Sequence, residues 1–167
     1  MPSDLSQAIN PLRLAKSRER IEGSLPLGSF ERLKDDLLEK TGTLEYQLVF
    51  DIDESGACVI QSIIDAQLML ECQRCLHPVV IEIHKSSLLG LVKDKDEIDN
   101  LAVEYEPLQL DEDTISVQSL IEDELILAVP LSPLHAENEC SGSQTLEQIN
   151  ADAKPKPFAV LAELKKK

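Results

Sequence analysis

Apolar residues at every second position dominate the middle of this chain. The run Leu44–Phe50 alternates in this way, and further β-type runs span residues 58–70 and 79–91. A period of two is typical of strands that bury one face and expose the other. The pattern therefore predicts an antiparallel sheet over about residues 43–91, with an additional short strand at 104–110.

Helical spacing flanks the predicted sheet. Apolar residues recur at helical intervals in 12–21, in 30–38 behind a capping serine at Ser29, and in 116–128. The strand at 58–70 is expected to be bulged near Asp65. Together these elements predict an α+β fold, in which N-terminal helices and the 116–128 helix pack on the sheet. The expected core members are Leu48, Phe50, Ile81, Ile83, Leu120, Ile121 and Leu125.

A length of 167 residues suits a single domain. We expect one α+β domain over 1–135, a mobile loop or linker over the polar stretch 136–157, and a short apolar motif with a basic tail over 158–167. No apolar run is long enough to span a bilayer, and Met1–Asn10 lacks the features of a secretory signal. Four cysteines are few for a disulfide scaffold, so the sequence predicts a reduced, cytoplasmic protein.

The negative charge of the chain is concentrated in its middle. The net charge is −15, yet residues 41–153 hold 23 acidic and four basic side chains, while residues 154–167 hold five lysines and one glutamate. Such an acidic body repels phosphate and attracts basic partners, or it is a solvated surface that favours solubility. A broad nucleic-acid-binding face on it is not expected.

Cys72-Gln73-Arg74-Cys75 forms a C-x-x-C motif between two predicted strands. Two thiols at this spacing can supply half of a tetrahedral zinc site. The second half is found at His135 and Cys140, if the end of the 116–128 helix folds back over the hairpin. The sequence thus offers Cys72, Cys75, His135 and Cys140 as a candidate zinc site.

The same thiols have two other interpretations. A redox function needs a lowered thiol pKa, usually from a helix that starts behind the first cysteine, and here a strand precedes Cys72. Alternatively the motif is a structural turn whose thiols pack or stay free. Cys58 lies inside a β-type run and is expected to be a small core residue.

No known catalytic motif is present: the nucleophile-elbow, phosphate-loop, dinucleotide-binding and zinc-protease patterns are all missing. His77 and His84 have no nucleophile nearby. The acidic triplet Glu122-Asp123-Glu124 is expected to form a solvated helix face rather than a cation site, since three consecutive residues fan out around a helix. The sequence does not indicate an enzyme.

Basic residues cluster near both ends of the chain and are the candidate contacts to RNA or to a partner. Such contacts give affinity without sequence readout, and scattered aromatic residues provide no stacking platform. A solvated tail is the alternative. The residues concerned are Arg13, Lys16, Arg18 and Arg20, predicted on the first helix, and Lys165, Lys166 and Lys167 at the end.

Several motifs, in order and spacing, resemble the YceD family, the large ribosomal RNA subunit accumulation proteins of bacteria. They extend over nearly the whole chain. They are Asn10–Ala15, Leu70–Cys75, Tyr105–Leu108, Glu122–Pro130 with Pro133–His135, and Lys156–Leu161 with the lysine tail.

The resemblance implies a non-catalytic role in ribosome biogenesis, supporting the accumulation or processing of large-subunit (23S) ribosomal RNA. Implied partners are the large-subunit precursor and a basic ribosomal protein or rRNA-processing factor. Relatives often carry a fuller second cysteine cluster, which resembles a zinc site, where this chain has only His135 and Cys140. The rival hypothesis is a metal- or thiol-dependent enzyme that uses the C-x-x-C.

Overall fold

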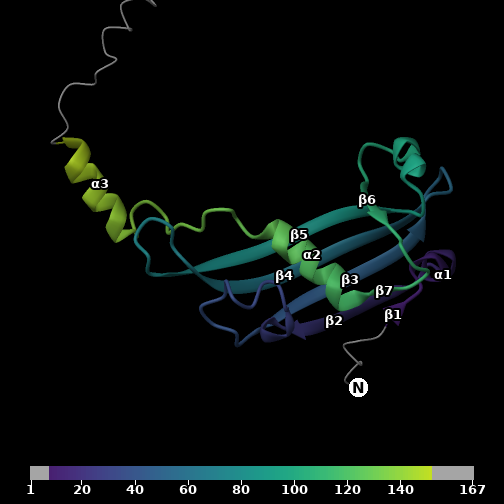
Figure 1. Ribbon diagram of the computed structural model, residues 1–167, viewed down its shortest axis with the longest axis horizontal. Coiled ribbons are helices and arrows are strands. Elements are labelled where there is room, and N and C mark those ends of the chain that lie inside the picture. Colours follow the sequence, from purple (N-terminus) through teal and green to yellow (C-terminus); the bar gives the residue numbers. More distant parts are fainter. Residues whose placement is uncertain (1–7, 152–167) are drawn as a thin grey trace, which may run out of the picture.

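The computed structural model describes residues 8–151 and centres on a five-stranded sheet (Figure 1). Its strands lie in the order β2-β3-β4-β5-β6, and β1 pairs separately with β7. The predicted α+β class is confirmed. The strands are β1 (Ala8–Ile9), β2 (Arg20–Pro26), β3 (Thr43–Ile52), β4 (Cys58–Glu71), β5 (Pro78–Val92), β6 (Glu106–Gln109) and β7 (Ile115–Ser116).

The strands β3, β4 and β5 form an antiparallel meander, as predicted. In the turn between β3 and β4, the Asp53 carboxylate accepts a hydrogen bond from the Ala57 amide, and Gly56 adopts a φ of 91° that suits glycine. The β4–β5 register runs unbroken from Val59 opposite Gly90 to Glu71 opposite Pro78. The predicted bulge near Asp65 is therefore wrong.

The edge strand β6 pairs with β5 in parallel, which corrects the expectation of a purely antiparallel sheet. The chain leaves β5, passes through the 3-10 helix η2 (Lys95–Asn100) and returns before β6 begins. Leu101 packs so closely on the backbone of Gly90 that a Cβ there would lie 2.8 Å from it. The bare backbone of Gly90 allows this connection to cross the strand.

Alternation along the strands places one face of the sheet inside and the other in solvent. On β4, Ile60, Ile64 and Leu68 are buried, whereas Gln61 and Asp65 are exposed. The helix α2 (Val117–Ala128) lies across the buried face, as Figure 1 shows, and begins where Ser116 caps the Ser119 amide. The expected helix and core are confirmed except that Ile81 is only partly buried.

The N-terminal helices are shorter than predicted. Helix α1 covers only Pro11–Ser17, because Arg18 adopts a left-handed conformation that ends it and β2 follows. Residues 30–38 form successive turns instead of a helix, preceded by the short 3-10 helix η1 (Leu27–Ser29). Phe30, Leu33 and Leu37 are still buried, whereas Leu38 is exposed. The Arg32 and Leu38 amides bond to distant groups, the Glu122 carboxylate and the Met69 carbonyl. Ser29 does not cap a helix; its hydroxyl donates to the Pro26 carbonyl.

The segment predicted as a mobile loop or linker, 136–157, contains the helix α3 (Ser141–Ala151). The division into a domain, a linker and a tail stays a prediction, and residues 158–167 lie outside the described part. None of the helices described between residues 8 and 151 is long and apolar enough to cross a membrane.

Candidate metal centre

The C-x-x-C forms the tight connection between β4 and β5. Two backbone hydrogen bonds of Cys72 close this turn. The Cys72 amide donates to the His77 carbonyl at 2.9 Å, and the Cys72 carbonyl accepts from the Leu76 amide at 2.8 Å. Leu76, within this turn, has a φ of 60°, an unusual backbone conformation for a leucine. Cys72 is buried and Cys75 is partly buried, so both thiols point to the protein side of the turn.

His135 and Cys140 come from the chain that follows α2, and this chain folds back over the β4–β5 turn. The Gln73 amide donates to the Pro133 carbonyl at 2.9 Å, which fixes the approach. On the far side, a Cβ on Gly142 would lie 2.9 Å from the Arg74 carbonyl oxygen. Glycine at position 142 therefore lets α3 begin against the turn. All four residues proposed from the sequence are brought together.

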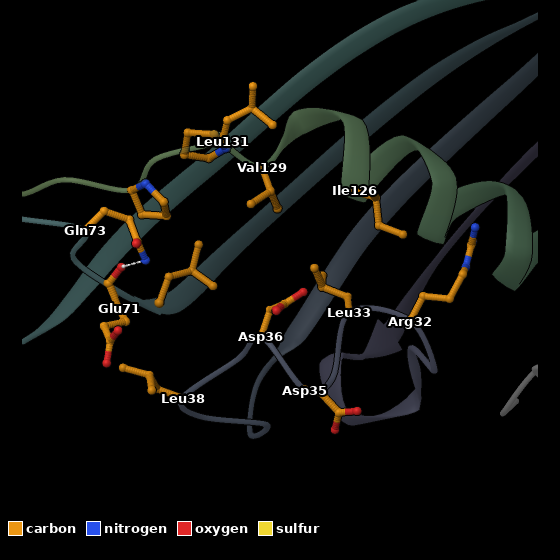
Figure 2. A pocket seen from close by; sticks show the side chains of 13 residues that line it. Arg32, Leu33, Asp35, Asp36, Leu38, Glu71, Gln73, Ile126, Val129 and Leu131 are labelled. Atoms are coloured by element: carbon orange, nitrogen blue, oxygen red, sulfur yellow. Dashed lines mark hydrogen bonds between the residues drawn. The ribbon is translucent and has the colours of Figure 1, made fainter. Parts of the chain in front are cut away.

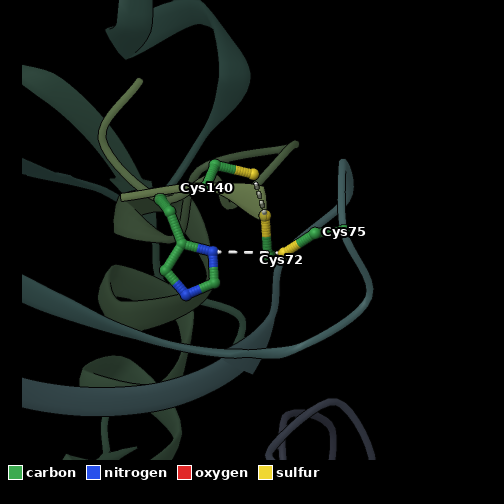
Figure 3. Close-up of side chains that lie close together, drawn as sticks. Cys72, Cys75 and Cys140 are labelled. Carbon is green, nitrogen blue, oxygen red and sulfur yellow. Dashed lines mark hydrogen bonds between the residues drawn. The ribbon is translucent and has the colours of Figure 1, made fainter. Parts of the chain in front are cut away.

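The four side chains converge into a group that could hold a metal ion (Figure 3). Their ligand atoms all lie within 4.8 Å of one another, with Cys72 Sγ 4.0 Å from Cys140 Sγ and Cys75 Sγ 3.4 Å from His135 Nδ1. Zinc bonds of about 2.3 Å to sulfur and about 2.0 Å to nitrogen separate two sulfurs by about 3.8 Å, and sulfur from nitrogen by about 3.5 Å. The Cys72–Cys140 and Cys75–His135 separations are close to these values.

A hydrogen bond to the Pro78 carbonyl orients the His135 ring. Its Nε2 lies 2.9 Å from the Pro78 carbonyl oxygen, which can only accept, so Nε2 carries a proton. In the neutral ring Nδ1 is then free of a proton and directed at the thiols. Metal-binding histidines are commonly oriented by such a bond from the second ring nitrogen.

The surroundings of Cys72 favour its thiolate. Burial opposes ionisation, but backbone hydrogen bonds from His135, Arg74 and Cys75 and the His135 side chain outweigh it and lower the pKa of Cys72 to about 5. The hydrogen bond to Cys72 in turn raises the pKa of His135, against the effect of desolvation. Thiolate is the form that binds metals. All four cysteines of the chain are free, and Cys58 is half-buried against the core rather than fully inside it.

The predicted basic contacts do not form one helical surface. Arg13 and Lys16 are exposed on α1, whereas Arg18 ends that helix and lies 3.0 Å from the Asp51 carboxylate. Arg20 opens β2 and pairs with Glu22 at 2.8 Å. The placement of Arg18 and Arg20 on the helix was wrong, because the helix ends before them. Lys165, Lys166 and Lys167 lie outside the described residues, and contact of any of these side chains with RNA stays a prediction.

Two carboxylates predicted to be solvated are buried. The side chains of Glu122 and Glu124 are only 8% and 4% exposed. Glu122 accepts a hydrogen bond from the Arg32 amide at 2.7 Å, and Glu124 binds Lys85 at 3.2 Å and the Ser87 hydroxyl. The sequence does indicate that Glu124 is buried, because it lies four positions after Leu120 and three after Ile121, on the same face of α2. Asp123 is exposed, as predicted.

Comparison with known proteins places this small α+β protein and its cysteine–histidine cluster in a defined family. The sequence profile described as "Large ribosomal RNA subunit accumulation protein YceD" matches residues 60–165, and the chain belongs to the YceD family. A relative of that name from Haemophilus influenzae is 32% identical over 170 residues, which cover 98% of this chain and 97% of that protein. No solved structure matches the chain significantly.

Proposed function

We propose that this protein is a non-catalytic ribosome-biogenesis factor, located in the cytoplasm, that supports the accumulation of large-subunit (23S) ribosomal RNA. The observation that carries the proposal is the full-length similarity to a relative named for large ribosomal RNA subunit accumulation. The negative charge of residues 41–153 suggests how the protein could act. With 23 acidic and four basic side chains in residues 41–153, it attracts basic proteins of the large-subunit precursor and repels bare RNA.

We further propose that Cys72, Cys75, His135 and Cys140 bind zinc as a structural ligand set. The fit rests on three thiols and an imidazole within 4.8 Å of one another and on the orientation of the His135 ring. A bound zinc ion supplies a cross-link between the β4–β5 turn and the chain after α2, segments about 60 residues apart in sequence. The Pro78 carbonyl supports this ligand set from outside, because it accepts a hydrogen bond from His135 Nε2 and so orients the ring.

A deletion strain tests the cellular role. We expect loss of the gene to lower the ratio of 23S to 16S rRNA, and the wild-type gene to restore it. An affinity-tagged chain should recover large-subunit proteins from lysate, and ribonuclease treatment should leave a direct protein partner bound. An unchanged rRNA ratio, or no ribosomal partner even in untreated lysate, rejects the proposal.

The rival function, an enzyme that uses the C-x-x-C thiols, is favoured by one observation: the lowered pKa of Cys72 is typical of a reactive thiol. Against it, Cys72 is completely buried, which keeps a substrate away from its sulfur. Cys72→Ser separates the two functions. A folded, metal-independent but inactive protein supports the enzyme, whereas a destabilised protein that has lost zinc supports a structural site.

A further inference from the structure

A surface pocket of about 570 Å³ lies beside the candidate metal centre (Figure 2). Three stretches of chain form it: the turns at 32–38, the end of β4 with residues 70–73, and the C-terminal end of α2 with residues 126–133. Figure 2 shows their side chains facing one another across the pocket. Segments far apart in sequence thus share one concave surface.

Large apolar side chains are left in solvent around this pocket. Leu38 is 51% exposed, Ile126 is 36% exposed, and Leu131 is fully exposed. The floor between them is apolar as well, with Leu33 and Leu70 buried beneath. Apolar residues gathered around a concavity, unlike scattered ones, mark a surface that another molecule covers.

The rim of the pocket is acidic. Asp35, Asp36 and Glu71 line it, and among the described residues Asp36 and Glu71 form no ion pair, while Asp35 lies 3.8 Å from Lys40. Arg32 is the one cation among the described residues that line the pocket, and it already pairs with Glu122 and Asp123. The pocket therefore presents unneutralised negative charge next to exposed leucines, which excludes RNA phosphate and favours lysine or arginine.

Hydrogen bonds from three backbone amides fix the walls of the pocket before any partner binds. The Arg32 amide donates to Glu122, the Leu38 amide donates to the Met69 carbonyl at 2.9 Å, and the Gln73 amide donates to the Pro133 carbonyl at 2.9 Å. The last bond joins a wall of the pocket to the candidate metal centre, since Gln73 lies between Cys72 and Cys75 in the chain. A preformed site loses less entropy when a partner binds.

We propose that this pocket binds a basic segment with large apolar side chains, presented by a partner protein. The proposal rests on the proposed function, because it assigns that segment to a protein of the large-subunit precursor. Leucine-like side chains of the partner contact Leu38, Ile126 and Leu131. Its lysine or arginine side chains pair with Asp36 and Glu71.

Fluorescence anisotropy with the full chain tests the proposal, using a short labelled peptide of leucine and lysine. One control peptide has serine in place of leucine, and another has glutamate in place of lysine. We expect only the leucine–lysine peptide to bind the wild-type chain. The double variant Asp36→Lys/Glu71→Lys should weaken this binding by about tenfold or more and take up the glutamate peptide. Leu131→Ser should also weaken it, through the apolar contact alone.

The matched control is Glu45→Lys/Glu82→Lys, which makes the same charge change at exposed positions on the solvent face of the sheet. It should leave the affinity nearly unchanged. Equal weakening by both double variants means nonspecific attraction to an acidic protein and overturns the proposal. Tighter binding of a peptide of residues 156–167 to the same pocket also overturns it, because the occupant is then the chain's own C-terminal segment.

The cellular test keeps this proposal separate from the proposed function. In the deletion strain, the Asp36→Lys/Glu71→Lys gene should fail to restore 23S rRNA while the Glu45→Lys/Glu82→Lys gene restores it. Full restoration by both rejects the pocket and leaves the ribosomal role intact. A deletion that never lowers 23S rRNA rejects the ribosomal role, whatever the peptides bind.

Discussion

At the scale of single residues, Glu124 is a buried carboxylate held between Lys85 and Ser87. A buried ion pair adds little net stability, but removing one partner leaves the other charge without compensation. We expect Lys85→Met to lower the free energy of unfolding by about 3 kcal/mol. The double variant Lys85→Met/Glu124→Met should recover most of that loss. Urea unfolding measures both, and equal stability of the single and double variants contradicts this account.

The four clustered ligand residues also make a prediction at this scale. Cys140→Ser removes a buried ligand, so we expect zinc content to fall and the free energy of unfolding to drop by on the order of 3 kcal/mol. Cys58→Ser is the matched control, because Cys58 is half-buried on β4 and belongs to no ligand cluster within the described part of the chain. It should keep its zinc and lose less than about 1 kcal/mol. Metal analysis and urea unfolding of both variants test the prediction. Equal zinc content in the Cys140→Ser and Cys58→Ser proteins refutes the proposed zinc site.

At the scale of elements, the turns at 30–38 depend on α2. Glu122 accepts from the Arg32 amide inside the protein, whereas Asp123 binds the same arginine only at the surface. We expect Glu122→Ala to cost about 2 kcal/mol and to speed hydrogen exchange at the Arg32 amide. Asp123→Ala, the control, should cost less than about 1 kcal/mol, because exposed ion pairs contribute little. Indistinguishable exchange at Arg32 in the two variants contradicts this role of Glu122.

The same turns show what sequence patterns can and cannot predict. Strands β3 to β5 and helix α2 were predictable, since each follows a period set by one buried face. Residues 30–38 have helical spacing too, yet two of their amides, those of Arg32 and Leu38, bond to distant acceptors instead of to the preceding turn. Local patterns carry no information about such acceptors. The parallel pairing of β6 was hidden for the same reason, because it depends on a crossing over Gly90.

The residues of the candidate metal centre were predictable from the sequence, but their convergence was not. Cys72 and Cys75 were evident from their spacing, and His135 and Cys140 were the remaining ligands of suitable chemistry. Their convergence depends on a tertiary contact, the bond from the Gln73 amide to the Pro133 carbonyl. The pocket beside them could not be predicted from sequence patterns, since its lining comes from three separate segments.

At the scale of the whole molecule, the candidate metal centre and the acidic pocket share one stretch of chain. Residues 126–133 line the pocket, and His135 follows two positions later. Without the metal, hydrogen bonds still join the chain after α2 to the β4–β5 turn region: the Gln73 amide donates to the Pro133 carbonyl, and His135 Nε2 donates to the Pro78 carbonyl. The Arg74 side chain also donates to the Ser143 hydroxyl. We expect the sheet and the packing of α2 to persist without the metal, because most of the core residues that hold them together are apolar side chains outside the ligand cluster. Metal loss should therefore loosen one wall without unfolding the domain.

Chelation of zinc from the full chain tests this coupling. We expect faster hydrogen exchange in residues 131–140, unchanged exchange in β3 and β4, and a several-fold weaker affinity for the leucine–lysine peptide, all reversed by added zinc. Cys140→Ser is the control, since it should show the weak affinity from the start and respond to neither chelator nor zinc. If chelation leaves peptide affinity unchanged while residues 131–140 exchange faster, the pocket and the metal centre act independently. If β3 and β4 also lose protection, the metal holds the entire fold together, and the pocket is lost only as part of general unfolding.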